Sequence, residues 1–191
     1  APDLVFVFVS ADRVHRADYI AKTLTRMLGT ESLVGCAAVS VIGNGAEIEG
    51  SPAVSIWLAT LPATKILTMH LTFEATSEGR EILGWPDELL ESWPVDADLI
   101  VLGEPFSFPA ELLLQQVNTR SPGCSVVGGM ASAAQQPGGN ALLRGTESLS
   151  HGAVCVLLSG SPRVFPVVSQ GCRQIGAPFV VTKSESNVIH E

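Results

Sequence analysis

The sequence carries the same order of elements twice, and this internal repeat limits the possible folds more than any other feature. Each copy begins with an apolar run that follows an aspartate and continues through a helical pattern. A glycine-containing strand, a Gly-Asn turn and a further apolar strand then follow. The matching stretches are DLVFVFVS and DLIVLGEP, LVGCAAV and VVGGMAS, GNG and GGN, and PAVSIWLA and GAVCVLLS. This shared order predicts a duplicated β-α-β-β unit, at about residues 3–73 and 98–160.

The strand patterns predict two sheets that pack on each other. Runs such as residues 3–9 are continuously apolar and rich in valine, which is typical of strands covered on both faces. Strong helical patterns occur at residues 15–28 and after Ser107-Phe108-Pro109. Two helices cannot cover both faces of one large sheet. We therefore expect an α/β fold of the α+β type, in which two mixed sheets pack face to face with flanking helices.

The segment between the two copies, residues 74–94, is predicted to be a connector. It is polar, and it contains Trp85 and Trp93, which we expect to pack it against the body. A short helix carrying Leu89 and Leu90 is expected to follow Trp85.

Composition excludes several classes of partner. The 191 residues carry a formal net charge of -8, which argues against a nucleic-acid or anionic-membrane partner.

The sequence also lacks the usual signals for membrane insertion and export. No stretch approaches the roughly 18 apolar residues that span a bilayer. The first residues lack a basic segment, so no signal peptide is expected, and the missing initiator Met suggests an excerpt or a processed chain. The four cysteines lack C-x-x-C spacing, which fits reduced thiols in a cytoplasmic protein.

The sequence contains no motif for a cofactor or a metal. It has neither a phosphate-binding P-loop nor a G-x-G-x-x-G segment after a strand. None of the four histidines (His15, His70, His151, His190) has metal-ligand spacing with another histidine, a cysteine or a carboxylate. We therefore expect no cofactor and no metal site.

Two glycine-rich regions leave alternatives open. Gly35 and the pair Gly128-Gly129 fall at matching points of the two copies, where glycine permits either tight strand packing or close approach of a ligand. Tight packing is the favoured interpretation. The small polar residues 130–140 suit either a mobile flap over a cleft or an ordinary hairpin.

The stretch Gln170-Gly171-Cys172-Arg173 interrupts two apolar runs and is the main candidate site. Glutamine offers a hydrogen-bond donor and acceptor, arginine offers a planar fork for a carboxylate, and glycine exposes the backbone. One interpretation is the polar end of an apolar cavity for a small zwitterion or acid. The other is a β-hairpin with a polar tip. A nucleophilic Cys172 would need a histidine base, and no local signature supports one, so we expect no catalytic residue.

Together these residues resemble the N-terminal part of the FIST domain, which occurs in bacterial signal-transduction proteins and in eukaryotic F-box proteins. The resemblance covers essentially the whole chain and is most specific from Gln170 to Asn187. The family pattern is close to Q-G-C-R-P-I-G-x-P-x-x-V-T, followed by a polar stretch and Asn. The matching residues are Gln170, Gly171, Cys172, Arg173, Ile175, Gly176, Pro178, Val181, Thr182 and Asn187. Gln174 stands where the family has proline, which leaves that turn less rigid.

The resemblance implies a non-enzymatic sensory module that binds a small ligand, with amino acids as the proposed ligands. It implies that residues 1–191 form one FIST N-terminal domain, in which residues 164–191 lead to a C-terminal part of the same protein. The ligand-binding residues expected from it and from the reasoning above are Gln170, Gly171, Cys172, Arg173, Gly128, Gly129 and Asn187. The alternative function is protein interaction, such as substrate recognition in an F-box-type ubiquitin ligase.

Overall fold

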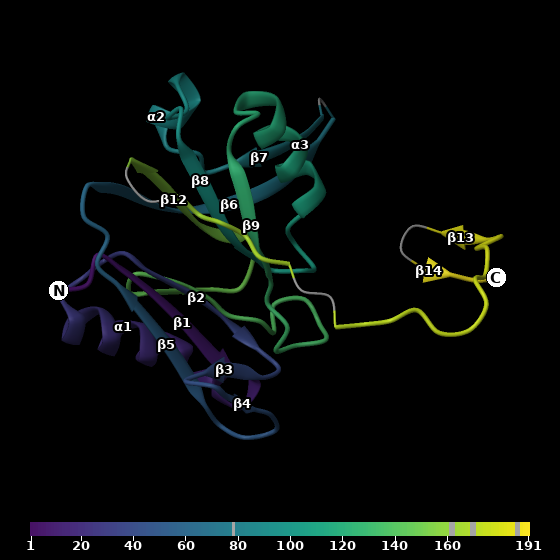
Figure 1. The fold of residues 1–191 in the computed structure, drawn as a ribbon, viewed down its shortest axis with the longest axis horizontal. Coiled ribbons are helices and arrows are strands. Elements are labelled where there is room, and N and C mark those ends of the chain that lie inside the picture. Colours follow the sequence, from purple (N-terminus) through teal and green to yellow (C-terminus); the bar gives the residue numbers. More distant parts are fainter. Residues whose placement is uncertain (78, 161–162, 169–170, 186–187) are drawn as a thin grey trace.

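The chain folds into two stacked sheets with a helix on each outer side (Figure 1). The structure is a computed structural model that describes residues 1–77, 79–160, 163–168, 171–185 and 188–191. Within these residues the first sheet has the strand order β11-β10-β2-β1-β5 and the second has the order β7-β6-β12-β8-β9. This arrangement confirms the predicted α+β fold of two face-to-face mixed sheets.

The elements of the first sheet and its helix come from residues 4–59 and 142–149. They are β1 (Leu4–Ser10), η1 (Ala11–Arg16), α1 (Ala17–Leu28), β2 (Leu33–Ala38), β5 (Val54–Ala59), β10 (Leu142–Arg144) and β11 (Glu147–Leu149). The expected helix at residues 15–28 therefore begins as a 3-10 turn and becomes α-helical at Ala17. It ends at Gly29, which has the left-handed conformation (φ 65°) that suits glycine.

The second sheet and its helices occupy the middle of the sequence. They are β6 (Thr64–Thr76), β7 (Gly79–Leu83), α2 (Asp87–Glu91), β8 (Ala97–Gly103), α3 (Ala110–Arg120), β9 (Ser125–Met130) and β12 (Ala153–Gly160). Two small hairpins lie outside the sheets: β3 (Val41–Gly43) with β4 (Ala46–Ile48), and β13 (Ser184–Glu185) with β14 (Val188–Ile189). No helix in the described residues is long and apolar enough to cross a membrane.

Three apolar clusters hold the four layers together. One lies between the sheets, where Leu4 and Leu142 meet Val154 and Val156. A second joins α1 to the outer face of the first sheet, and a third joins α3 to the outer face of the second. Trp85 and Trp93 belong to the third cluster, with ring centroids 5.6 Å apart, as the connector prediction required. Burial of apolar surface on both faces of each sheet is the main stabilising term.

The two β-α-β-β units have the same register at their closest point. In the first unit Val7 of β1 lies opposite Gly35 of the parallel strand β2. In the second, Val101 of β8 lies opposite Gly128 of the parallel strand β9. A Cβ atom on Gly35 would lie 1.9 Å from the carbonyl oxygen of Val7, and one on Gly128 would lie 1.8 Å from that of Val101. Both positions therefore require glycine for packing, and the origin of the two units by duplication stays a prediction.

The units exchange strands, so each sheet contains residues from both halves of the chain. Strand β10 of the second unit pairs with β2 of the first, with Leu142 opposite Cys36. Strand β6, at the end of the first unit, pairs with β12 of the second, with Leu71 opposite Ala153. Neither unit therefore has a complete sheet of its own.

Two aspartates anchor the chain where it leaves the equivalent strands β5 and β12. Oδ2 of Asp3 accepts a hydrogen bond from the backbone N–H of Leu61 (2.7 Å). Oδ2 of Asp98 accepts one from the backbone N–H of Val164, also at 2.7 Å. Asp3 directly precedes β1 and Asp98 is the second residue of β8, so in both units an aspartate at the start of the first strand holds the chain that leaves the last one.

Two carboxylates of the second unit are buried. Asp98 and Glu104 are fully covered, and they lie at opposite ends of β8. The side chain of Glu104 accepts hydrogen bonds from Asn140 Nδ2 (3.1 Å) and Ser107 Oγ (2.7 Å). Asn140 in turn accepts from the backbone N–H of Ala134 (3.0 Å), so the loop at residues 130–140 is anchored to the core.

Replacing Gly128 by alanine is expected to lower the free energy of unfolding by about 2–3 kcal/mol, because the new methyl group meets the Val101 carbonyl. The matched control is Gly129→Ala in the same strand, where an added Cβ has no atom within 4 Å. Urea unfolding monitored by circular dichroism measures both variants. Equal stability of the two variants would contradict the packing role of Gly128.

Candidate functional site

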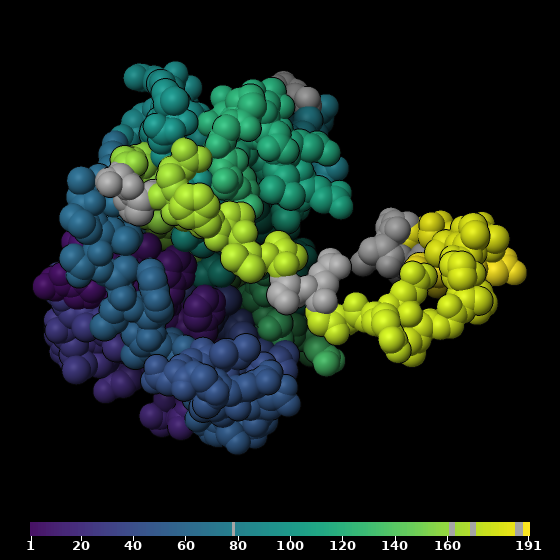
Figure 2. All heavy atoms as spheres, viewed as in Figure 1, coloured from purple at the N-terminus to yellow at the C-terminus, as the bar shows by residue number. Residues whose placement is uncertain are grey.

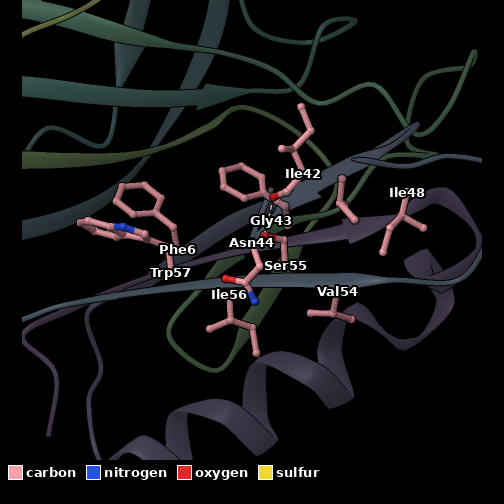
Figure 3. Close-up of a pocket in the computed structure, with 11 residues that line it drawn as sticks. Phe6, Ile42, Gly43, Asn44, Ile48, Val54, Ser55, Ile56 and Trp57 are labelled. Carbon is pink, nitrogen blue, oxygen red and sulfur yellow. Dashed lines mark hydrogen bonds between the residues drawn. The ribbon is translucent and has the colours of Figure 1, made fainter. Parts of the chain in front are cut away.

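A cavity of about 650 Å³ opens at the edge of the first sheet (Figure 3). It lies where β1 and β5 meet the small hairpin β3–β4. Its lining residues are Phe6, Phe8, Val41, Ile42, Gly43, Asn44, Ile48, Val54, Ser55, Ile56 and Trp57. We take this cavity as the candidate ligand site.

Aromatic side chains from two neighbouring strands form one wall of the cavity. In the antiparallel pair β1–β5, Phe6 lies opposite Trp57 and Phe8 lies opposite Ser55. Residues that face each other across a pair, and every second residue along a strand, share one face of the sheet. The ring centroids are 5.7 Å apart for Phe6 and Trp57, and 6.4 Å apart for Phe6 and Phe8. The period-two pattern of β1 therefore places three aromatic rings side by side.

The hairpin β3–β4 forms a second wall. Asn44 (φ 51°) and Gly45 (φ 73°) both have left-handed backbone conformations, as the predicted Gly-Asn-Gly turn requires. The hydroxyl of Ser55 donates a hydrogen bond to the carbonyl oxygen of Ile42 (2.8 Å) and ties the hairpin to β5. The cavity thus combines a rigid strand pair with a turn held by one hydrogen bond.

The chemistry of the lining is apolar and neutral. None of the lining residues is charged, and the side chains of Asn44 and Ser55 provide its polar groups. Ligand sites commonly combine apolar walls with a few polar groups that orient the ligand. This lining fits the uncharged, apolar part of a small molecule and leaves any charged group of that molecule at the mouth.

Of the residues predicted from sequence, the five that the structure describes do not line this cavity. Gly128 and Gly129 lie in β9, at an edge of the second sheet, where the first of them is required for packing. Gly171, Cys172 and Arg173 are exposed in a segment that runs away from the stacked sheets (Figure 2). Gln170 and Asn187 lie outside the described residues. The predicted ligand-binding role of these seven residues stays a prediction.

The alternative prediction, that residues 170–173 form the polar tip of a β-hairpin, is wrong for the residues that the structure describes. Residues 171–183 have no regular secondary structure, and the short hairpin β13–β14 follows them. Val180 and Val181, which belong to the apolar run after Arg173, are exposed. This apolar run therefore has no covering layer in the structure.

Sequence reasoning missed the cavity because its residues have the pattern of core strands. The side chains of Phe6, Phe8 and Trp57 alternate as expected for a covered sheet, and only the tertiary structure shows that Trp57 is 53% exposed. The local signal that was present is the Asn-Gly turn beside an apolar strand, which predicted a hairpin but no cavity.

The cysteines divide into three buried thiols and one exposed thiol. Burial raises the pKa of Cys36 to about 12. Desolvation, with a smaller effect from the nearby Asp98 carboxylate, raises the pKa of Cys124 to about 11. Burial also raises the pKa of Cys155, whereas Cys172 is exposed. The buried thiols stay protonated at neutral pH and are therefore poor nucleophiles.

Comparison with known proteins places the chain in a family. The model of the FIST N domain matches residues 3–191. An uncharacterized protein of Mycobacterium bovis, Mb0898c, is 37% identical over 191 residues, which cover 100% of this chain and 48% of the relative. The uncharacterized protein Rv0628c of Mycobacterium tuberculosis is 36% identical over 190 residues, again covering 100% of this chain and 48% of the relative.

The chain belongs to the FIST family, because the family model covers almost all of its residues. This confirms the resemblance found in the sequence. The chain spans about half the length of the curated relatives it matches. The family is associated with signal transduction and small-ligand sensing, and its domains are generally not catalytic.

Alkylation at pH 8 is expected to modify Cys172 alone in the folded chain, because the other three thiols are buried and protonated. Mass spectrometry after iodoacetamide treatment should show one added group per chain, and four groups only after unfolding in denaturant. The Cys172→Ser variant should show none in the folded state. Rapid native labelling of Cys36, Cys124 or Cys155 would contradict the burial described above.

Proposed function

We propose that this chain is a non-catalytic sensory module of intracellular signal transduction, and that the cavity beside β5 binds its small ligand. The observation that carries the proposal is the aromatic, uncharged lining of a cavity of about 650 Å³. This volume lies within the range of roughly 300–1,000 Å³ that is usual for small-molecule sites. Membership of the FIST family supports a sensory function, and we place the protein in the cytoplasm.

The proposed ligand is an amino acid or a related small acid with an apolar body. Its apolar part would lie against Phe6 and Trp57, whose rings form one wall, and the amide of Asn44 would orient a polar group. A carboxylate would remain at the mouth, because the lining contains no cation. Arg173 is our candidate for the partner of that carboxylate, and its approach requires the exposed C-terminal segment to move against the first sheet.

The second candidate function is protein interaction, as in the substrate-recognition part of an F-box-type ubiquitin ligase. The observation that favours it is the set of half-exposed apolar side chains on β5: Trp57 lies on the inner face of the sheet, and Ile56 and Leu58 lie on the outer face. An exposed strand edge can bind a partner protein by adding a strand. The C-terminal FIST part of the same protein is a further partner that we propose.

A thermal-shift screen of the chain against the amino acids and common small acids tests the sensory function. A ligand that binds only the folded state stabilises it by mass action. At about 100 times its Kd, a ligand should raise the Tm by roughly 5–10 °C for a chain of this size. A Tm that does not change with any compound at millimolar concentration would contradict the proposal and favour protein interaction.

The Trp57→Ala variant is expected to weaken binding of any compound found in that screen by about tenfold or more, because it removes an aromatic wall of the cavity. The matched control is Phe106→Ala, which truncates an aromatic side chain of similar exposure (47%) outside the cavity. Isothermal titration calorimetry measures both affinities. Equal affinities for the two variants would place the ligand elsewhere.

A further inference from the structure

Strand β5 has an uncovered edge. Among the described residues it pairs with β1 on one side only, so the backbone groups of its other side lack strand partners. Its sequence Val-Ser-Ile-Trp-Leu-Ala contains no charged residue. Natural edge strands usually carry charges, prolines or bulges that prevent pairing, and a long apolar edge without them tends to acquire a further strand.

The second unit shows how such an edge is covered. Strand β12 is the equivalent of β5, since it pairs antiparallel with β8 as β5 pairs antiparallel with β1. Its other side is covered by β6, which is antiparallel to it from Ala153 to Gly160. Strand β6 is formed by the segment that follows β5 and crosses to the other sheet. By the same correspondence, the segment that follows β12 is the structural equivalent of β6.

The segment that follows β12 is held in the same way as the segment that follows β5. The Asp98–Val164 hydrogen bond repeats the Asp3–Leu61 hydrogen bond that precedes β6. Val164 packs against the cluster between the sheets, and Ala59 and Leu61, at the end of β5 and just beyond it, pack against the same cluster. The residues after Val164 therefore start from the same apolar cluster that the C-terminal end of β5 contacts.

The residues that follow have the composition of a strand but no covering layer. Residues 165–168 read Phe-Pro-Val-Val, and Phe165 and Val167 are 83% and 90% exposed. Large apolar side chains that are solvated on both this segment and β5 would gain free energy by mutual burial. Proline is tolerated in an edge strand when the position of its missing N–H faces solvent. If Pro166 takes such a position, the N–H groups of its neighbours Phe165 and Val167 point the other way, toward β5.

We propose that residues 165–168 add to the open edge of β5 as an antiparallel strand, in the way that β6 adds to β12. The added strand lies beside Ile56, Trp57 and Leu58, reduces the exposure of their side chains on both faces of the sheet, and passes beside the cavity. It also brings Gly171, Cys172 and Arg173 toward the cavity mouth. The contact forms within one chain and does not need a ligand.

Amide hydrogen exchange of β5, measured by NMR on the ligand-free 191-residue chain, tests this contact. The amides of β5 that point away from β1 are expected to be protected. The Val167→Pro variant removes a donor aimed at β5 and should speed their exchange by about tenfold or more. The matched control is Val168→Pro, whose lost N–H faces solvent and which should leave the protection nearly unchanged.

Three outcomes overturn the proposal. The first is fast exchange of these amides in the unchanged chain, and the second is equal protection in all three proteins. The third is protection that appears only at high protein concentration, which would show that a second copy covers β5. The exchange measurement uses no ligand, so a failed ligand screen does not contradict the strand contact. Absence of the strand contact likewise does not contradict a positive ligand screen.

Discussion

Two pairs of parallel strands approach so closely that no side chain fits between them, and the arrangement of both sheets follows from this approach. Gly35 faces the backbone of Val7 and Gly128 faces that of Val101, with no room for a Cβ atom at either glycine. Gly35 fixes the register of β1 and β2, because a shift by one residue would place the side chain of Val34 or Cys36 against a carbonyl oxygen. Gly128 likewise excludes the shift of β9 that would bring Val127 opposite Val101. The same register places Phe6 and Phe8 on the inner face of the first sheet and Val5 and Val7 under α1.

The exchange of strands between the two units explains why the cavity lies at an edge of the first sheet. Strand β6 covers β12, and β10 covers β2, so these strands have partners on both sides. Strand β5 is covered on one side only in the described residues, and its aromatic residue Trp57 remains half exposed beside Phe6. The cavity with apolar walls therefore lies beside β5, the strand that has no partner from the second unit. A ligand could enter the cavity, and a further strand could pair with the open edge of β5.

The sequence predicted local features well and long-range features poorly. The repeat, the strands, both long helices and the Gly-Asn-Gly turn depend on residue spacing that a window of the sequence contains. The pairing of β10 with β2 joins residues more than a hundred positions apart, and such pairing leaves no local pattern. Burial of Glu104 also escaped prediction, because its partner Asn140 comes from a distant loop. The polar stretch at Gly171–Arg173 drew attention by composition, whereas the cavity is formed by residues typical of a core.

The most direct test of the account is to locate a bound ligand. Two-dimensional NMR spectra of the chain, recorded during titration with a compound that stabilises it, show which backbone amides change their environment. The largest shift changes are expected at Phe6, Asn44, Ser55 and Trp57, which line the cavity from two strands and a turn. Changes confined to Gly128 and Gly129, with none at the cavity, would contradict it and would return the ligand site to the residues that the sequence alone suggested.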